Sequence, residues 1–214
     1  MMNYTCNPCF RYGGQMEIKG VGTLSLMPDK AIVSLGVITE DKSLEKAQKE
    51  NIERTNAVIR NLTNLGVEMK DISTSNYSIQ AQYDYVDGKK IFRGYKVTNI
   101  LDVTVRNISD LGKIIDSSVK AGANSVGSIR FTVSDKQKYY EKALNLAIKN
   151  AISKAMSIGK TLNVSVNKIP IIIKEELNDS QIQNTALIKS YSASTEILPS
   201  NVSINAVVKC IFRY

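Results

Sequence analysis

The feature that most constrains the fold is a long amphipathic stretch at residues 136–161, in which two rows of side chains recur every four residues. The small row is Ala143, Ala147, Ala151, Ala155 and Gly159, and the large row is Tyr140, Leu144, Ile148, Ile152 and Met156. A row of small residues lets a helix approach a sheet or another helix closely. The pattern therefore predicts the longest helix of the chain. The lysines on the opposite side, Lys138, Lys142, Lys149 and Lys160, indicate a solvated face.

Alternating β-prone residues predict the strands. Residues 17–26 and 31–39 flank a turn that contains Pro28 and Asp29, so they predict a β-hairpin. Residues 72–86 and 91–106 flank Asp87-Gly88, a strong hairpin signal. Three further strands are predicted at 125–134, at 164–176 and at 201–213. Pro170 favours an edge position for the second of these, and the third closes the fold.

Two shorter helices complete the pattern. The first spans residues 44–65, with Ser43 as its N-cap and Gly66 at its end. Its apolar stripe comprises Leu44, Ala47, Ile52, Thr55, Val58, Ile59, Leu62 and Leu65. The second spans 110–121, between Ser109 as cap and Gly122 as stop. The class is α+β with mostly antiparallel sheets, one long and two shorter helices, in the order ββαββαβαββ.

The polar segments predict the mobile parts. Residues 1–15 are interpreted as a flexible N-terminal tail, 16–214 as one domain, and 178–200 as a long mobile loop within it. The first sixteen residues lack the apolar core of a secretory signal, and no stretch reaches 18 apolar residues. We therefore expect no membrane span and a cytoplasmic location.

The absence of histidine limits the chemistry that the chain can perform. The usual general base near neutral pH and the commonest metal ligand are both missing. No spacing of carboxylates, lysines or cysteines points to a reaction either. We predict a protein that is not an enzyme, with no catalytic, cofactor-binding or metal-binding residues, no cofactor and no small-molecule substrate.

Three kinds of motif are candidates for chemistry. Cys6-Asn7-Pro8-Cys9 fits a redox pair or half of a zinc site, but its position in a tail favours adventitious pairing. Gly20-Val21-Gly22 is half of a nucleotide fingerprint, and it lies inside a predicted strand instead of before a helix. The carboxylates near predicted turns, Asp84, Asp87, Glu175 and Glu176, are interpreted as solvated.

Several short motifs in order resemble the SIMPL (DUF541) family. They are Val21-Gly22, Pro28-Asp29-Lys30-Ala31, Leu35-Gly36-Val37, Ala47, Leu65-Gly66-Val67, Asp71-Ile72-Ser73-Thr74, Tyr77, Gly94-Tyr95-Lys96-Val97-Thr98-Asn99, Ala121-Gly122-Ala123-Asn124 and the alanine row. The resemblance covers residues 17–214 and implies a fold without recognised catalytic residues. The family includes a periplasmic immunogenic protein that resembles a ring- or barrel-forming oligomer, and a eukaryotic member linked to kinase signalling. We expect two departures from the family pattern, namely no signal peptide and Ser200-Asn201 before the last strand.

Two functions follow from these observations. The leading hypothesis is a homo-oligomer, a self-assembling structural or interaction protein held by strand edges and by the helix around residues 140–159. The closing strand 201–213 is predicted to be a poorly protected edge, because it carries few charges before Lys209. The alternative is a basic module that binds nucleic acid or an anionic surface, since the formal net charge is +8. The lysines form no dense run, so a solvated surface explains them better.

Overall fold

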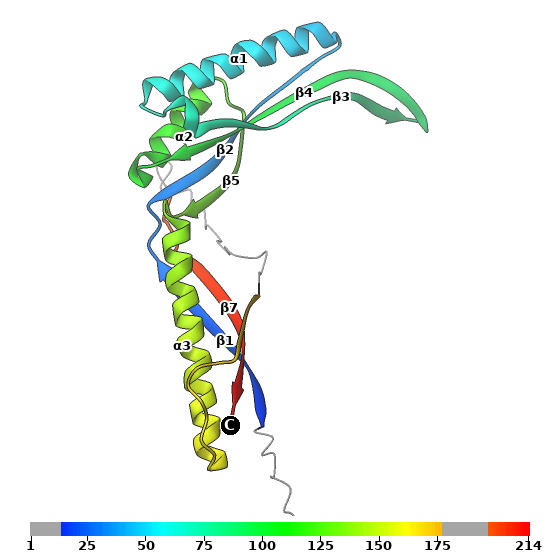
Figure 1. The fold of residues 1–214 in the computed structure, drawn as a ribbon. Helices are drawn as coiled ribbons and strands as arrows, with labels where there is room; N and C mark the ends of the chain where they lie inside the picture. The colour runs from blue at the N-terminus through cyan, green and yellow to red at the C-terminus, as the bar shows by residue number, and fades with distance from the viewer. Residues whose placement is uncertain (1–13, 177–196) are drawn as a thin grey trace, which may run out of the picture. The chain divides into compact units, whose positions relative to one another are not determined.

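The computed structural model describes residues 14–176 and 197–214 and confirms the α+β class and the predicted order of elements. The elements are β1(Gln15–Leu26), β2(Lys30–Asp41), α1(Leu44–Asn64), β3(Ile72–Val86), β4(Lys89–Val105), α2(Leu111–Lys120), β5(Ser125–Thr132), α3(Lys136–Leu162), β6(Ile172–Glu176) and β7(Val202–Arg213). Single 3₁₀ turns at Met69–Asp71 and Ile108–Asp110 precede β3 and α2. The predicted mobile loop, for residues 177–196, and the tail as far as residue 13 lie outside the described residues. The chain divides into two compact units (Figure 1).

The first unit comprises α3 and a three-stranded sheet in the order β1-β7-β6. Figure 1 shows α3 lying along β1 and β7. The predicted small row is its contact face: Ala143, Ala147, Ala151, Ala155 and Gly159 are all buried. Gly20 and Gly22 of β1 face this row, and a Cβ atom on Gly22 would lie 2.0 Å from the carbonyl oxygen of Ala143. Small residues on both elements therefore bring the helix against the strand.

The second unit comprises α1, α2 and a four-stranded antiparallel sheet in the order β3-β4-β2-β5. Alternate residues of β2, from Ala31 to Val37, are buried on one face, against which α1 packs. Ser43 caps α1 as predicted, accepting a hydrogen bond from the Lys46 backbone N–H at 3.5 Å. Gly66 follows the helix with φ +87°, the left-handed conformation expected of a C-terminal glycine.

The β3–β4 hairpin was predicted correctly. Asp87 and Gly88 have φ values of +50° and +76°, and β3 pairs with β4 from Ile72↔Val103 to Val86↔Lys89. Two positive φ values in a two-residue loop are the geometry that matches the twist of the flanking strands.

The predicted hairpin between residues 17–26 and 31–39 is wrong, because β1 and β2 belong to different sheets. The turn between β1 and β2 forms its hydrogen bonds with residues 132–134. The Asp29 backbone N–H donates to the Thr132 carbonyl at 3.2 Å, and Asp29 Oδ1 accepts from the Ser134 N–H at 2.8 Å. The two strands have complementary partners of different kinds. The glycines of β1 fit the alanine row of α3, whereas β2 presents large apolar residues to α1.

Three smaller predictions also change. The closing strand is central, since β7 lies between β1 and β6, so it is not an exposed edge. The strand predicted at 164–176 shortens to β6, which begins two residues after Pro170 and does lie at an edge. Ser109 does not cap α2; it lies in the 3₁₀ turn and donates to the Asn107 side chain at 2.8 Å. That extra turn moves the start of the α-helix to Leu111.

Candidate interaction surface

A two-stranded ribbon extends from the sheet of the second unit. β2 pairs with β4 only between Tyr95 and Val105, so residues 89–94 of β4 have β3 as their strand partner and no β2 partner. Figure 1 shows this ribbon continuing past the end of β2 and curving away from α1. An isolated two-stranded ribbon is marginally stable in water, so its side chains must either cluster among themselves or find a partner.

The ribbon exposes an aromatic cluster. Tyr83 and Phe92 are direct cross-strand partners whose ring centroids lie 5.7 Å apart in an edge-to-face arrangement. Phe92 makes a similar contact with Tyr95 at 5.2 Å, and the Lys90 ammonium lies 3.9 Å from the centre of the Tyr83 ring. These contacts stiffen the ribbon. Much apolar area of the ribbon still faces solvent, on Tyr83, Tyr85, Val86, Ile91 and Phe92, of which Tyr85 is 73% exposed.

A polar pocket of about 220 Å³ lies where the ribbon leaves the sheet. Its lining residues are Glu40, Asp41, Lys42, Gln82, Arg93, Gly94 and Tyr95. Arg93 is already paired, 2.6 Å from a Glu40 oxygen and 3.9 Å from an Asp84 oxygen. The pocket is smaller than the range typical of ligand sites, about 300–1,000 Å³. Arg93 of the ribbon and Glu40 of β2 bind each other, and this ion pair connects the ribbon to the end of β2.

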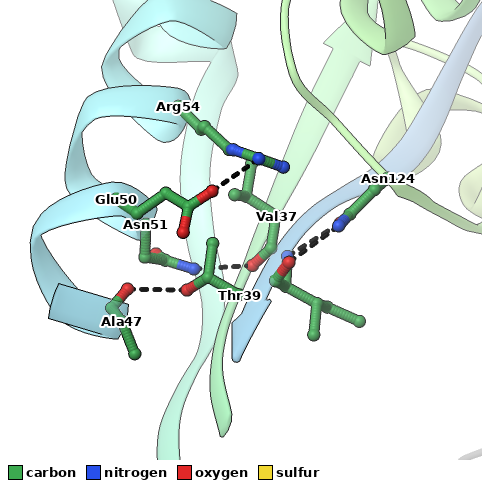
Figure 2. A network of polar contacts seen from close by, with 8 residues as sticks. Val37, Thr39, Ala47, Glu50, Asn51, Arg54 and Asn124 are labelled. Carbon is green, nitrogen blue, oxygen red and sulfur yellow. Dashed lines mark hydrogen bonds and ion pairs between the residues drawn. The ribbon is translucent and has the colours of Figure 1, made fainter. Parts of the chain in front are cut away.

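Buried polar contacts hold α1 onto the strands from which the ribbon extends (Figure 2). The Asn51 side-chain amide donates to the carbonyl oxygens of Val37 on β2 at 2.9 Å and Val97 on β4 at 3.3 Å. The Thr39 hydroxyl donates to the Ala47 carbonyl at 2.7 Å. Asn51 is completely buried and joins three elements, so its position sets the base of the ribbon.

Asn51 was not predicted to be a buried residue, because the expected apolar stripe included Ile52 instead. The structure buries Asn51 and leaves Ile52 49% exposed. The available signal was spacing, because Asn51 lies four residues from both Ala47 and Thr55 and therefore on their side of the helix.

Asn124 also forms side-chain hydrogen bonds with the backbone of β2, on the side that faces β5. Its side chain accepts from the Ile38 N–H at 2.8 Å and donates to the Ile38 carbonyl at 2.7 Å (Figure 2). The backbone N–H of Asn124 also donates to the Gly36 carbonyl at 2.9 Å. The side chain thus continues the β2–β5 ladder by one rung past Ser125, where β5 begins.

Charged and phenolic groups in the first unit make structural contacts. The Tyr140 hydroxyl of α3 donates to the Glu175 carboxylate of β6. Glu176 lies 3.2 Å from Lys19 of β1 and 3.1 Å from Lys209 of β7. The hydrogen bonds from Lys209 and Lys19 lower the pKa of Glu176, and Glu176 in turn raises the pKa of Lys209. Glu175 is exposed, as expected, and Glu176 is half-buried; both also tie β6 to its neighbours.

The Tyr140–Glu175 bond predicts a late-titrating tyrosine. The hydrogen bond to Glu175 and partial burial raise the pKa of Tyr140 to about 12, from an ordinary value near 10. Folding favours the neutral phenol, so the stabilisation is present below pH 10 and is lost as the pH rises through 12. Ultraviolet titration should show a tyrosinate step near pH 12, and this step should be absent in the Tyr140→Phe variant. The control is Tyr139→Phe at the adjacent position, in which the step should still be present. A late step that survives Tyr140→Phe would contradict the assignment.

Only some of the motifs considered for chemistry lie within the described residues. Cys6 and Cys9 lie outside those residues. Cys210 is buried in β7, and burial raises the pKa of its thiol, which disfavours the reactive thiolate. Within 14–176 and 197–214, no three side chains of His, Cys, Asp or Glu gather as a metal site would require. Gly20 and Gly22 lie inside β1 beneath α3, where their lack of a side chain serves packing. No described helix has both the length and the apolar composition needed to cross a membrane.

Sequence comparisons place the chain among proteins without an assigned activity. The model of the SIMPL family, described as "Protein of unknown function (DUF541)", matches residues 16–212. The "Uncharacterized protein YggE" of Escherichia coli K12 is 33% identical over 147 residues, 69% of this chain and 60% of that protein. The "26 kDa periplasmic immunogenic protein" of Brucella melitensis is 29% identical over 160 residues, 72% of this chain and 64% of that protein. The chain thus spans about three fifths of the length of these relatives.

The Brucella relative contradicts the prediction of a cytoplasmic location. Its name assigns that protein to the periplasm and points to export. The prediction rested on the composition of the first sixteen residues alone.

Proposed function

Because the chain belongs to the SIMPL family of proteins of unknown function, we propose that it works by assembling with copies of itself, and not by turning over a substrate. The observation that carries this proposal is the exposed aromatic ribbon of β3 and β4. Tyr83, Tyr85 and Phe92 are each at least 42% exposed to solvent. A ribbon that contacted only water would not need aromatic side chains at these positions. Exposed apolar clusters of this kind mark interaction sites in soluble proteins.

The arrangement of the ribbon supports a binding role over a catalytic one. Two of its cationic side chains are already engaged, since Arg93 pairs with Glu40 and Lys90 lies over Tyr83. A rigid set of aromatic rings with two torsion angles each gives contact area at a low cost in conformational entropy, which is why such residues are enriched at interfaces.

The proposal predicts an assembled protein in solution. Light scattering at micromolar concentration should give a mass that is a multiple of 23.7 kDa. Replacing two exposed ribbon residues, Tyr85→Ser with Ile91→Ser, should lower that mass while the far-ultraviolet circular dichroism stays unchanged. The matched control is Ile169→Ser with Leu198→Ser, which removes two comparably exposed apolar side chains outside the ribbon. A monomeric parent protein would refute self-assembly. Steeply salt-dependent binding to DNA or anionic vesicles would then favour the basic binding module.

A further inference from the structure

The two sheets have four edges, at β1 and β6 in the first unit and at β3 and β5 in the second. An edge strand presents unpaired N–H and C=O groups, so proteins shorten, charge or cover the edges that must stay unpaired. An edge that lacks every such protection is therefore a candidate for pairing with another strand.

Three of the four edges are protected. On β1, the Asn150 side chain accepts from the Val21 N–H at 3.1 Å, and Lys154 donates to the Lys19 carbonyl at 2.9 Å. β6 has only five residues, and three of them are charged. β5 has eight residues with the exposed Arg130, and its pairing with β2 shifts register between Val33 and Leu35.

β3 lacks these protections. It is 15 residues long, contains no Pro and no Lys or Arg, and has Asp84 as its one charged residue. Its ladder with β4 shifts at Ser75, between Thr74 and Asn76. The second shift, between Gln82 and Tyr83, places the extra residue on β4. Residues 76–86 of β3 therefore form an unbroken strand whose outer side has no strand partner within the part of the chain that the structure describes.

The sequence of this strand is nearly symmetric about Ala81. Apolar side chains stand at every second position, and polar side chains stand at the alternate positions. The apolar set is Tyr77, Ile79, Ala81, Tyr83 and Tyr85, and the polar set is Ser78, Gln80, Gln82 and Asp84. A two-fold interface needs a surface that complements itself, and this strand meets that requirement when it pairs antiparallel with a copy of itself.

We propose that β3 is the interface between two copies of this chain, with the β3 strands paired antiparallel about a two-fold axis at Ala81. In this register Tyr77 lies opposite Tyr85 of the second copy, and Ile79 lies opposite Tyr83. These are the aromatic and β-branched cross-strand pairs that stabilise sheets. Asp84 lies opposite Ser78, so no like charges meet. The pairing joins two four-stranded sheets into one of eight strands, and it rests on the proposed function of self-assembly.

Two acidic substitutions on β3 test the edge. In this register Gln80 lies opposite Gln82 of the second copy, so Gln80→Glu with Gln82→Glu places like charges across the interface. Within one chain Gln80 pairs with Lys96, which the new carboxylate would attract. The mass by light scattering should fall to half of the parent mass or less. The control is Val126→Glu with Ser128→Glu, the same change in charge at the same spacing on β5, and it should retain the parent mass.

Crosslinking tests the register of the paired strands, and it also tests the β3 interface if the acidic variant does not fold. In a Cys6→Ser, Cys9→Ser background, Ala81→Cys should form a disulfide-linked dimer under mild oxidation, whereas Ser128→Cys on β5 should not. An assembled parent whose β3 variant keeps its full mass and whose Ala81→Cys form does not crosslink would overturn the β3 interface and leave self-assembly standing. A monomeric parent would instead overturn both.

Discussion

Gly22→Ala should be among the most destabilising single substitutions in this protein, lowering the free energy of unfolding by about 3 kcal/mol. A methyl group on Gly22 would lie 2.0 Å from the Ala143 carbonyl oxygen and 2.5 Å from the Ala147 nitrogen. Both atoms are backbone atoms of α3, so relief requires the helix to move away from β1 along a buried contact. Overpacking of this kind cannot be relieved by a rotamer change.

Urea unfolding followed by circular dichroism would measure this loss. The control is Gly127→Ala in β5, where the new methyl group would lie 3.2 Å from the Ser34 Cβ atom and a shift of a few tenths of an ångström gives room. Equal losses at both positions would show that the change reflects glycine's backbone freedom and not the helix–strand contact.

Ala151→Leu tests the same contact from the helix side. Because Ala151 is fully buried against β1 within one chain, that substitution should destabilise the protomer itself.

Asn51→Asp should destabilise the second unit strongly and in a pH-dependent way. The substitution keeps the shape of the side chain but replaces the amide donor with a carboxylate that faces the carbonyl oxygens of Val37 and Val97. A fully buried carboxylate in that position must take up a proton to avoid repulsion and desolvation. Keeping a group of ordinary pKa near 3.9 protonated at pH 7 costs about 4 kcal/mol, at 1.36 kcal/mol per pH unit.

The stability of the Asn51→Asp variant relative to the parent should rise as the pH falls. The folded-state pKa of the carboxyl group introduced at position 51 would be raised, so the folded state binds a proton that the unfolded state releases as the pH rises. The difference in unfolding free energy between variant and parent should therefore shrink by about 2–3 kcal/mol between pH 7 and pH 5. Asn56→Asp, exposed on the same helix, should show no such trend. A loss at Asn51→Asp that does not change with pH would mean that water reaches the site.

The candidate interaction surface was only partly predictable from the sequence. Asp87-Gly88 and the flanking alternation predict the β3–β4 hairpin correctly, because the turn and the pairing are local. The exposure of Tyr83 and Phe92 was not predictable. It depends on where β2 ends beside β4, which is a contact between residues more than fifty positions apart.

Which strands lie at a sheet edge was also not predictable from the sequence. The low charge of residues 201–213 made the closing strand resemble an unprotected edge, but β7 lies in the middle of its sheet, where a low charge is what burial requires. The strand without protection is β3, whose composition looks ordinary until its position in the sheet is known. Local sequence cannot distinguish a central strand from an unguarded edge, because both favour uncharged β-prone residues.

Local patterns were sufficient to predict the elements of this protein, their order, the buried side of α3 and the lack of a histidine-dependent chemistry. Those properties depend on periodicities of 3.6 and 2 residues, on caps and turns, and on composition, all of which act over a few positions. Long-range contacts separate β1 and β2 into different sheets and leave β3 open at an edge. Each of these follows from shape and hydrogen-bond complementarity between distant segments, such as the glycines of β1 with the alanines of α3, and no local pattern encodes which segment will be the partner.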